Sequence, residues 1–213
     1  MNAGQKRELD ALVQRIKVCR ICRDEPQGAA LPHEPRPVLR VSATARIAIC
    51  GQAPGIKVHE SGVPFTDRSG DRLREWMAVS SGEFYDQSVV AIVPMGFCFP
   101  GYDAKGGDRP PRRECAPHWR SEVMRHLPNL ELLLVVGSYA VRWHLPERGR
   151  EALSDTVGAW RVILERPGIK PPVLPLPHPS WRNTGWLKAN PWFTAEVLPV
   201  LRQRVRAAIK GGA

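Results

Sequence analysis

The sequence lacks any apolar run that could cross a membrane. Its longest apolar stretches, ARIAIC and LELLLVVG, are far shorter than the ~20 residues that a membrane-spanning helix needs. The first residues, MNAGQKRELDALVQRIK, contain acidic side chains and no apolar segment typical of a signal peptide. We therefore expect a cytoplasmic protein with no membrane partner.

Nucleotide-binding signatures are also missing. Neither GxxxxGK[ST] nor GxGxxG occurs, which argues against a nucleotide fold, and no internal repeat is apparent. Acidic residues are in the minority, with 21 Asp and Glu against 31 Lys and Arg, for a net charge of +10. An excess of this size favours an anionic partner such as nucleic acid, although it also fits a role in solubility alone.

The pattern of apolar residues predicts an α/β fold. Short apolar segments alternate with helical patterns, as in a parallel sheet covered by helices. The predicted strands are residues 45–50, 88–94, 130–136 and 172–176. Helices are predicted at 5–18, around 71–79, from about 114, after 137 and over 190–207, and 151–164 is assigned to helix or turn plus an edge element. We expect one domain spanning residues 1–213, a length that supports a single core.

The most informative stretch is CGQAPGIKVHESGVPFTDRSGDRLREWM, from Cys50 to Met77. It leads from a predicted strand through a glycine-rich turn into a helix, for which Ser69 or Asp71 is the expected N-cap. This arrangement places backbone N–H groups and small polar side chains at the carboxyl edge of a sheet. Open α/β sheets bind their ligands at that edge.

Four side chains in this stretch suggest a binding or catalytic site. His59, Glu60 and Asp67 can take part in acid–base chemistry, and Phe65 could stack on a planar ligand. Asp67 follows Phe65 by two residues, so in extended backbone both side chains would point to the same face. Alternatively, Glu60 and Asp67 are solvated loop carboxylates, Phe65 is a core residue, and the DxSG segment only caps a helix.

A second stretch, HPSWRNTGW, begins at His178 between two prolines, which constrain its backbone. Ser180 could contact a phosphate, while Trp181 and Arg182 could enter a base stack or contact a nucleic-acid backbone, with Asn183 beside them. A lone histidine in such a loop more often hydrogen-bonds a core carbonyl. The clustering of these five residue types in a basic protein favours nucleic-acid binding.

The five cysteines form a third pattern. Cys19 and Cys22 make a CxxC pair, and Cys98 and Cys115 flank a loop rich in Gly, Pro and Arg. Cys50 occupies a buried strand position and is expected to be a core residue. In a cytoplasmic protein the other four suggest ligands of zinc or of a [4Fe–4S] cluster rather than disulfides. Four unrelated buried thiols are the alternative.

Taken together, GQAPG, GVPFTDRSGDRL, the C-terminal HPS and the CxxC…C…C pattern resemble the uracil-DNA glycosylase superfamily, nearest to its iron–sulfur families 4 and 5. The resemblance covers nearly the whole chain. It implies a three-layer α/β/α sandwich around a four-stranded parallel sheet, a flipped-out uracil and hydrolysis of the N-glycosidic bond. It also implies single- or double-stranded uracil-containing DNA as partner. The implied ligands of a structural [4Fe–4S] cluster are Cys19, Cys22, Cys98 and Cys115.

Two positions depart from the family pattern. Family 4 resembles GEAPG, with a Glu thought to act on the attacking water, whereas this chain has Gln52, which cannot be a base. The uracil-reading Asn expected before the third cysteine is absent from VPMGFC. Family 5 instead has an Asp in a segment resembling FTGDxSG, and Asp67 is its nearest counterpart.

These comparisons lead to expected roles for the site residues. Asp67 is expected to position water or stabilise the cationic sugar, and His178 to stabilise the leaving uracil anion as a neutral donor. The Gln52 amide is the alternative for positioning water. The expected uracil-binding residues are Gly51, Ala53, Phe65, His59 and Glu60. We expect a monomeric glycosylase; a non-catalytic reader of damaged or abasic DNA is the alternative.

Overall fold

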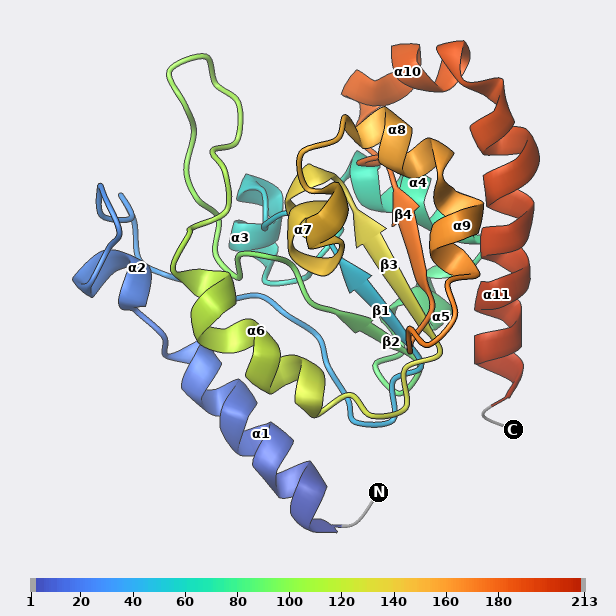
Figure 1. The fold of residues 1–213 in the computed structure, drawn as a ribbon. Coiled ribbons are helices and arrows are strands. Elements are labelled where there is room, and N and C mark those ends of the chain that lie inside the picture. The colour runs from blue at the N-terminus through green and yellow to red at the C-terminus, as the bar shows by residue number, and fades with distance from the viewer. Residues whose placement is uncertain (1–2, 212–213) are drawn as a thin grey trace.

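The computed structural model describes residues 3–211, in which four parallel strands form one sheet (Figure 1). The strand order is β2-β1-β3-β4. The strands are β1 (Ile47–Cys50), β2 (Val90–Ile92), β3 (Leu132–Val136) and β4 (Val173–Leu176). All their residues are buried, as expected for a parallel sheet covered on both faces. The predicted α/β class, and all four predicted strands, are confirmed.

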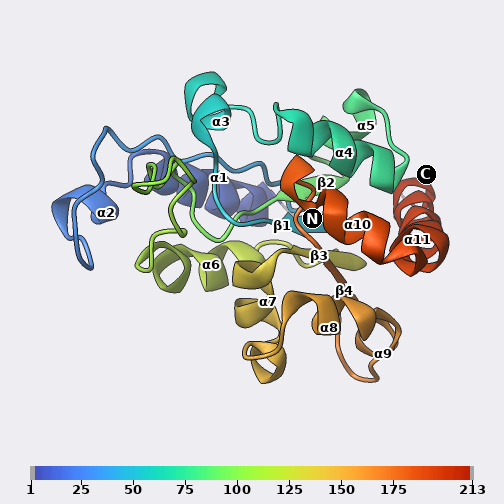
Figure 2. The same cartoon turned by 90° about the horizontal axis from the view of Figure 1, so that it is seen from above.

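Helices cover both faces of the sheet (Figure 2). Packed against one face are α1 (Ala3–Lys17), α6 (Cys115–Arg125) and α7 (Ser138–His144). Packed against the other are α4 (Arg68–Met77), α5 (Ser81–Tyr85) and α11 (Leu198–Lys210). Alternate residues of β1 divide between the two cores: Ala48 and Cys50 pack with the first group, Ile47 and Ile49 with the second. The result is a three-layer arrangement.

The remaining helices are short. They are α2 (Ile21–Asp24), α3 (Ile56–Ser61), α8 (Leu153–Gly158), α9 (Trp160–Leu164) and α10 (Thr184–Ala189), with 3₁₀ turns at Pro146–Arg148 and Trp181–Asn183 and a π-helical segment at Phe193–Val197. The prediction of an edge element within residues 151–164 is wrong, because α8 and α9 occupy this segment. Trp160, Ile163 and Leu164 are buried at helical spacing. The segment 56–61, expected to be part of a turn, is helical.

The N-cap of α4 is Asp67, not Ser69 or Asp71 as predicted. Asp67 has extended backbone, and its Oδ1 accepts a hydrogen bond from the Gly70 N–H at 3.2 Å. The helix therefore begins two residues earlier than a Ser69 cap predicts and four earlier than an Asp71 cap predicts, and both residues lie in its first turn.

None of the helices in residues 3–211 combines the length and the apolar character that crossing a membrane requires.

Candidate active site

A cavity of about 520 Å³ opens at the carboxyl edge of the sheet. Loops that follow β1, β2 and β4 form its walls, so segments distant in sequence meet there. Most of the predicted site residues line this cavity: Gly51, Gln52, Ala53, Phe65, Asp67, His178, Ser180, Trp181, Arg182 and Asn183.

Two predicted substrate-binding residues, His59 and Glu60, are not among the residues that line the cavity. Both belong to α3, whose helical turn directs them elsewhere. The His59 ring packs edge-on against His33, with 4.5 Å between ring centroids, and lies tilted to Phe99. Glu60 is exposed to solvent. His59 therefore joins α3 to the segments that carry the cysteines.

The turn before α4 directs the Phe65 ring towards β1. A Cβ placed on Gly51 would lie 3.5 Å from the Phe65 ring, an ordinary van der Waals distance, so the ring lies beside the start of the turn. Phe65 has a positive φ of 57°, a left-handed backbone that costs a non-glycine residue on the order of 1–3 kcal/mol. The expectation of extended backbone here was wrong, although both Phe65 and Asp67 line the cavity.

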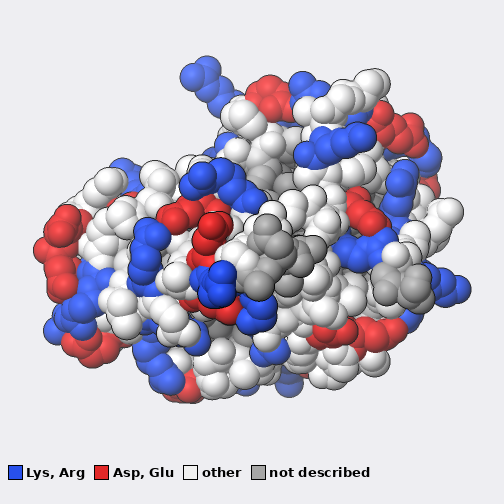
Figure 3. Space-filling view, turned by 90° about the horizontal axis from the view of Figure 1, so that it is seen from below, with Lys and Arg blue, Asp and Glu red and all other residues white. Residues whose placement is uncertain are grey.

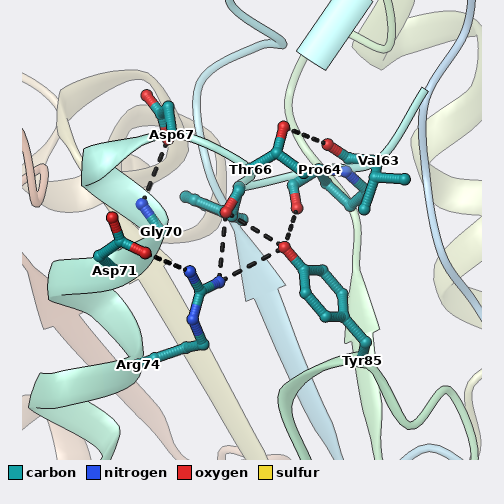
Figure 4. A network of polar contacts seen from close by, with 9 residues as sticks. Val63, Pro64, Thr66, Asp67, Gly70, Asp71, Arg74 and Tyr85 are labelled. Atoms are coloured by element: carbon teal, nitrogen blue, oxygen red, sulfur yellow. Dashed lines mark hydrogen bonds and ion pairs between the residues drawn. The ribbon is translucent and has the colours of Figure 1, made fainter. Parts of the chain in front are cut away.

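Three contacts hold the Phe65 backbone in this conformation. Figure 4 shows the surrounding network, in which Arg74 and Tyr85 point towards the turn before α4. The Phe65 carbonyl accepts a hydrogen bond from Arg74 Nη1 at 3.2 Å, and the Tyr85 hydroxyl lies 3.1 Å away. Gly70 packs so closely that a Cβ there would lie 1.8 Å from the same carbonyl oxygen. Arg74 in turn forms an ion pair with Asp71 at 2.7 Å. The α4 helix thus fixes the Phe65 ring.

His178 is half-buried at the start of the loop that follows β4. Burial lowers the pKa of His178, and the charge of Asp67 opposes this effect only in part. The imidazole is therefore neutral at pH 7 and can donate one N–H. Its backbone carbonyl accepts a hydrogen bond from Asn183 Nδ2 at 2.7 Å, so Asn183 braces the loop that carries the histidine.

An arginine that the sequence did not single out links the two motifs. Arg72 of α4 donates hydrogen bonds to the Ser180 carbonyl at 2.9 Å and to Thr184 Oγ1 at 3.2 Å. At the cavity mouth Trp181 is 65% exposed, and the Arg182 guanidinium lies over its ring at 5.9 Å from the centroid. The exposed pair is available to contact a large ligand.

Another wall of the cavity comes from the segment between Cys98 and Cys115. Tyr102, Asp108 and Arg109 of this segment line the cavity. The sequence analysis missed them because a loop rich in Gly and Pro carries no periodic pattern that would orient a side chain. The two aspartates in GYDAKGGDR were the available signal.

A buried arginine supports the floor of the cavity. Arg120 of α6 is 1% exposed, and its Nη1 donates to the carbonyls of Val93 and Pro94, both at 3.0 Å. Its other nitrogens contact His144 Nε2 at 2.7 and 3.0 Å. Pro94 lines the cavity, so Arg120 fixes the chain where it leaves β2.

The four predicted ligand cysteines also converge. Cys19, Cys22, Cys98 and Cys115 line one small apolar cavity of about 10 Å³, apart from the larger one. Two of their sulfurs accept N–H donors: Cys115 from the Phe97 backbone at 3.3 Å, and Cys19 from Trp119 Nε1 at 3.2 Å. The thiols of Cys22 and Cys98 are hydrogen-bonded to each other, which lowers the pKa of Cys22 to about 7.

All five cysteines in the described residues are free thiols, and Cys50 is fully buried in β1 as predicted. Across residues 3–211, no group of three or more His, Cys, Asp or Glu side chains is arranged to hold a single metal ion. All four thiols border the same small cavity, and two of their sulfurs accept N–H donors.

Comparison with known families agrees with this geometry. Residues 40–202, more than half of the chain, match the family model of the uracil DNA glycosylase superfamily. The match includes the turn after β1, the loop after β2 and the HPSWRN segment, which are the parts that form the larger cavity. The chain therefore belongs to the uracil DNA glycosylase superfamily.

Proposed function

We propose that this protein removes uracil from DNA by hydrolysing the N-glycosidic bond, which leaves an abasic site for base excision repair. Superfamily membership suggests glycosylase activity on uracil or another damaged base in DNA. The observation that carries the proposal is that the Phe65 ring, Asp67 and His178 line one cavity at the carboxyl edge of the sheet.

The cavity residues suit a flipped-out base. Extruding a base from a duplex costs a few kcal/mol, which stacking on an aromatic ring such as Phe65 helps to offset. The base leaves as an anion, so a fixed neutral donor such as His178 stabilises charge that develops only in the transition state. The free oxygen of Asp67 would stabilise the cationic sugar or position water.

Residues at the cavity mouth suit the DNA around the extruded nucleotide. Trp181 or Arg182 would occupy the space that the base leaves in the stack. Ser180 would contact a phosphate, although its hydroxyl already accepts a hydrogen bond from the Arg182 backbone N–H at 3.2 Å. Arg72 ties this loop to α4, the helix that also holds the Phe65 turn.

We further propose that Cys19, Cys22, Cys98 and Cys115 hold a [4Fe–4S] cluster, with zinc as the alternative. When bound, such a group would act structurally, joining the segment around α2 to the loop after β2 and to α6. The N–H donors to Cys19 and Cys115 support this choice, because such bonds stabilise thiolate ligands.

A second candidate function is a non-catalytic reader of damaged or abasic DNA. The observation in its favour is Gln52, whose side chain cannot act as a base and which lines the cavity. In that case the pocket would bind an extruded nucleotide without breaking its glycosidic bond.

The test is incubation with a uracil-containing oligonucleotide followed by alkali. We expect strand scission at the uracil, with the matching thymine oligonucleotide as the control. Binding in a gel-shift assay without scission would favour the reader. Neither binding nor scission would contradict both candidates.

A further inference from the structure

The segment between Cys98 and Cys115 forms a narrow hairpin that projects beyond the sheet (Figure 1, green). Tyr102 and Asp108 pair as an isolated antiparallel bridge, and the Arg109 N–H donates to the Gly101 carbonyl at 2.9 Å. At the tip, Asp103 Oδ1 accepts hydrogen bonds from the backbone of Lys105 at 2.8 Å and of Gly107 at 2.9 Å. These local bonds define where the backbone of Asp108 lies.

The Asp108 side chain faces the turn that follows β1. It lines the larger cavity, and its Oδ2 would lie 3.4 Å from a Cβ placed on Gly55. Within residues 3–211 its carboxylate forms no hydrogen bond or ion pair. Asp67, by contrast, uses one oxygen to cap α4. Asp108 is therefore a carboxylate in the site that no structural role occupies.

Three charged groups surround Asp108. Asp108 is exposed at the edge of the cavity, but partial desolvation of its carboxylate raises the pKa of Asp108, the charges of Asp67 and Asp103 raise it further, and Arg182 opposes the increase. A carboxylate whose pKa is raised towards 7 is a stronger general base at pH 7 than a carboxylate with an ordinary pKa.

The other groups near the first motif are less suited to accept a proton. Gln52 has no basic group, and Glu60 does not line the cavity, whereas Asp108 does. Asp67 is restricted by its capping bond and by the left-handed turn before it. The hairpin supplies a further carboxylate, which lies beside the turn that follows β1.

We propose that Asp108 is the general base of the reaction, an inference that rests on the proposed glycosylase function. Its carboxylate holds a water molecule near C1′ of the extruded nucleotide. The water oxygen bonds to C1′ as the C1′–N1 bond breaks, the electron pair leaves with uracil, and Asp108 takes the proton of the water. Asp67 then stabilises the cationic sugar, and His178 stabilises the uracil anion.

The experiment is single-turnover excision from a uracil-containing duplex by Asp108→Asn, at saturating protein and over a range of pH. We expect a loss of roughly 10²–10³ in rate with unchanged DNA affinity. The wild-type rate should rise with pH through the raised pKa of Asp108, because only the ionised carboxylate accepts a proton. Asp108→Asn should lose this acid limb, and Asp108→Glu should keep it. The matched control, Glu60→Gln, should behave as wild type.

Each other result overturns the assignment. If Asp108→Asn keeps the wild-type rate and pH profile, Asp108 is not the base, although the proposed function stands. If it is slow but retains the acid limb, or binds DNA weakly, its role is structural. If wild-type protein excises no uracil while it binds the duplex, the proposed function itself fails, and this role with it.

Discussion

Asp67 has one structural role and one proposed catalytic role, and a substitution can separate them. Its Oδ1 caps α4, and its carboxylate also lines the cavity, where it would face an extruded nucleotide. Asn is as good an N-cap as Asp, so Asp67→Asn removes the charge and keeps the cap. Asp67→Ala removes both, at a cost of about 1 kcal/mol in helix stability.

We therefore expect Asp67→Asn to fold with wild-type stability but to excise uracil roughly 10²–10³ more slowly, because a group that stabilises transition-state charge is lost. His178→Ala should lose a similar factor, since its N–H donor disappears. Single-turnover cleavage and DNA affinity measured side by side would check both, and affinity should hardly change.

Gln52→Ala is the companion variant. If it loses rate while Asp67→Asn keeps the wild-type value, the amide of Gln52 positions the water and the role given to Asp67 is wrong.

A second residue-scale prediction concerns His144. Burial and the adjacent Arg120 lower the pKa of His144 to about 3 from its usual 6.5. Between these values the unfolded chain binds a proton that the folded protein does not, so stability falls as pH decreases from about 6.5 towards 3. Linkage of this size amounts to roughly a few kcal/mol.

His144→Gln should flatten that acid loss, because the amide can still accept from Arg120 but does not titrate. Denaturant unfolding measured between pH 4 and about 7.5 would check this prediction, because that range spans the usual His pKa of about 6.5. His118→Gln, at an exposed position of α6, is the control and should follow the wild-type curve. Identical curves for all three proteins would contradict the assignment.

For single residues, the sequence identified members of the site better than it predicted their backbone conformation. His178 was found because prolines and other unusual residues surround it, and Gln52 because of a motif. The left-handed φ of Phe65 was not predictable, because it depends on the close contact with Gly70 and on the side chain of Arg74. Asp108 was missed because only the folded hairpin brings it to the cavity.

Among the elements, α4 is the one on which the Phe65 turn depends. A Cβ on Gly70 would lie 1.8 Å from the Phe65 carbonyl oxygen, a backbone atom that cannot move aside alone. Gly70→Ala should therefore displace the turn and destabilise the fold by about 1–3 kcal/mol, despite the better helix propensity of Ala. Denaturant unfolding would measure the loss, and binding of uracil should weaken because the Phe65 ring moves.

Gly185→Ala in α10 is the matched control, since a Cβ there meets no atom within 4 Å. It should be neutral or slightly stabilising. Equal stability of the two variants would show that Gly70 is not required by packing.

The cysteine segment gives the second element-scale prediction. If Cys19, Cys22, Cys98 and Cys115 hold an iron–sulfur cluster, the purified protein should be brown and contain iron. Cys19→Ser should lose iron and stability, whereas Cys50→Ala, in the buried strand, should keep iron and cost on the order of 1 kcal/mol. Elemental analysis decides between iron and zinc. A colourless protein with neither metal would contradict the proposal.

Elements were predictable where one local pattern decides them. The four strands were recognised because they are continuous apolar runs, and α11 because Leu198, Leu201 and Val205 share a face. The short helices α3 and α10 have few residues and weak patterns, so they depend on their surroundings. The start of α4 was misjudged because the sequence offers three possible caps within five residues.

For the whole molecule, the position of the cavity follows from topology. In the strand order β2-β1-β3-β4, the chain passes from β1 to β2 on one side of it and then crosses back to β3 on the other side. Loops from β1, β2 and β4 then open at one edge, where parallel sheets bind ligands. The strand order alone is enough to predict the position of the cavity. It does not predict that the hairpin between Cys98 and Cys115 forms one of the cavity walls.

The net charge of +10 is also distributed in an informative way. Figure 3 shows the molecule from below, away from the cavity, and there Lys and Arg alternate with Asp and Glu. Near the cavity mouth Arg109 and Arg182 form no ion pair within the described residues. Their charges are available for phosphates.

Binding to uracil-containing DNA should weaken steeply with salt, because each phosphate contact releases counterions. If Arg182 fills the gap left by the extruded base, Arg182→Ala should weaken binding to duplex DNA more than to single strands. If it only contacts a phosphate, both should weaken alike, and the slope of log K against log salt should fall by about 0.9 on duplex. Fluorescence anisotropy at several salt concentrations separates these outcomes. Arg7→Ala is the control and should leave both the slope and the duplex preference unchanged, because Arg7 is exposed on α1, a helix that lies away from the hairpin in Figure 1.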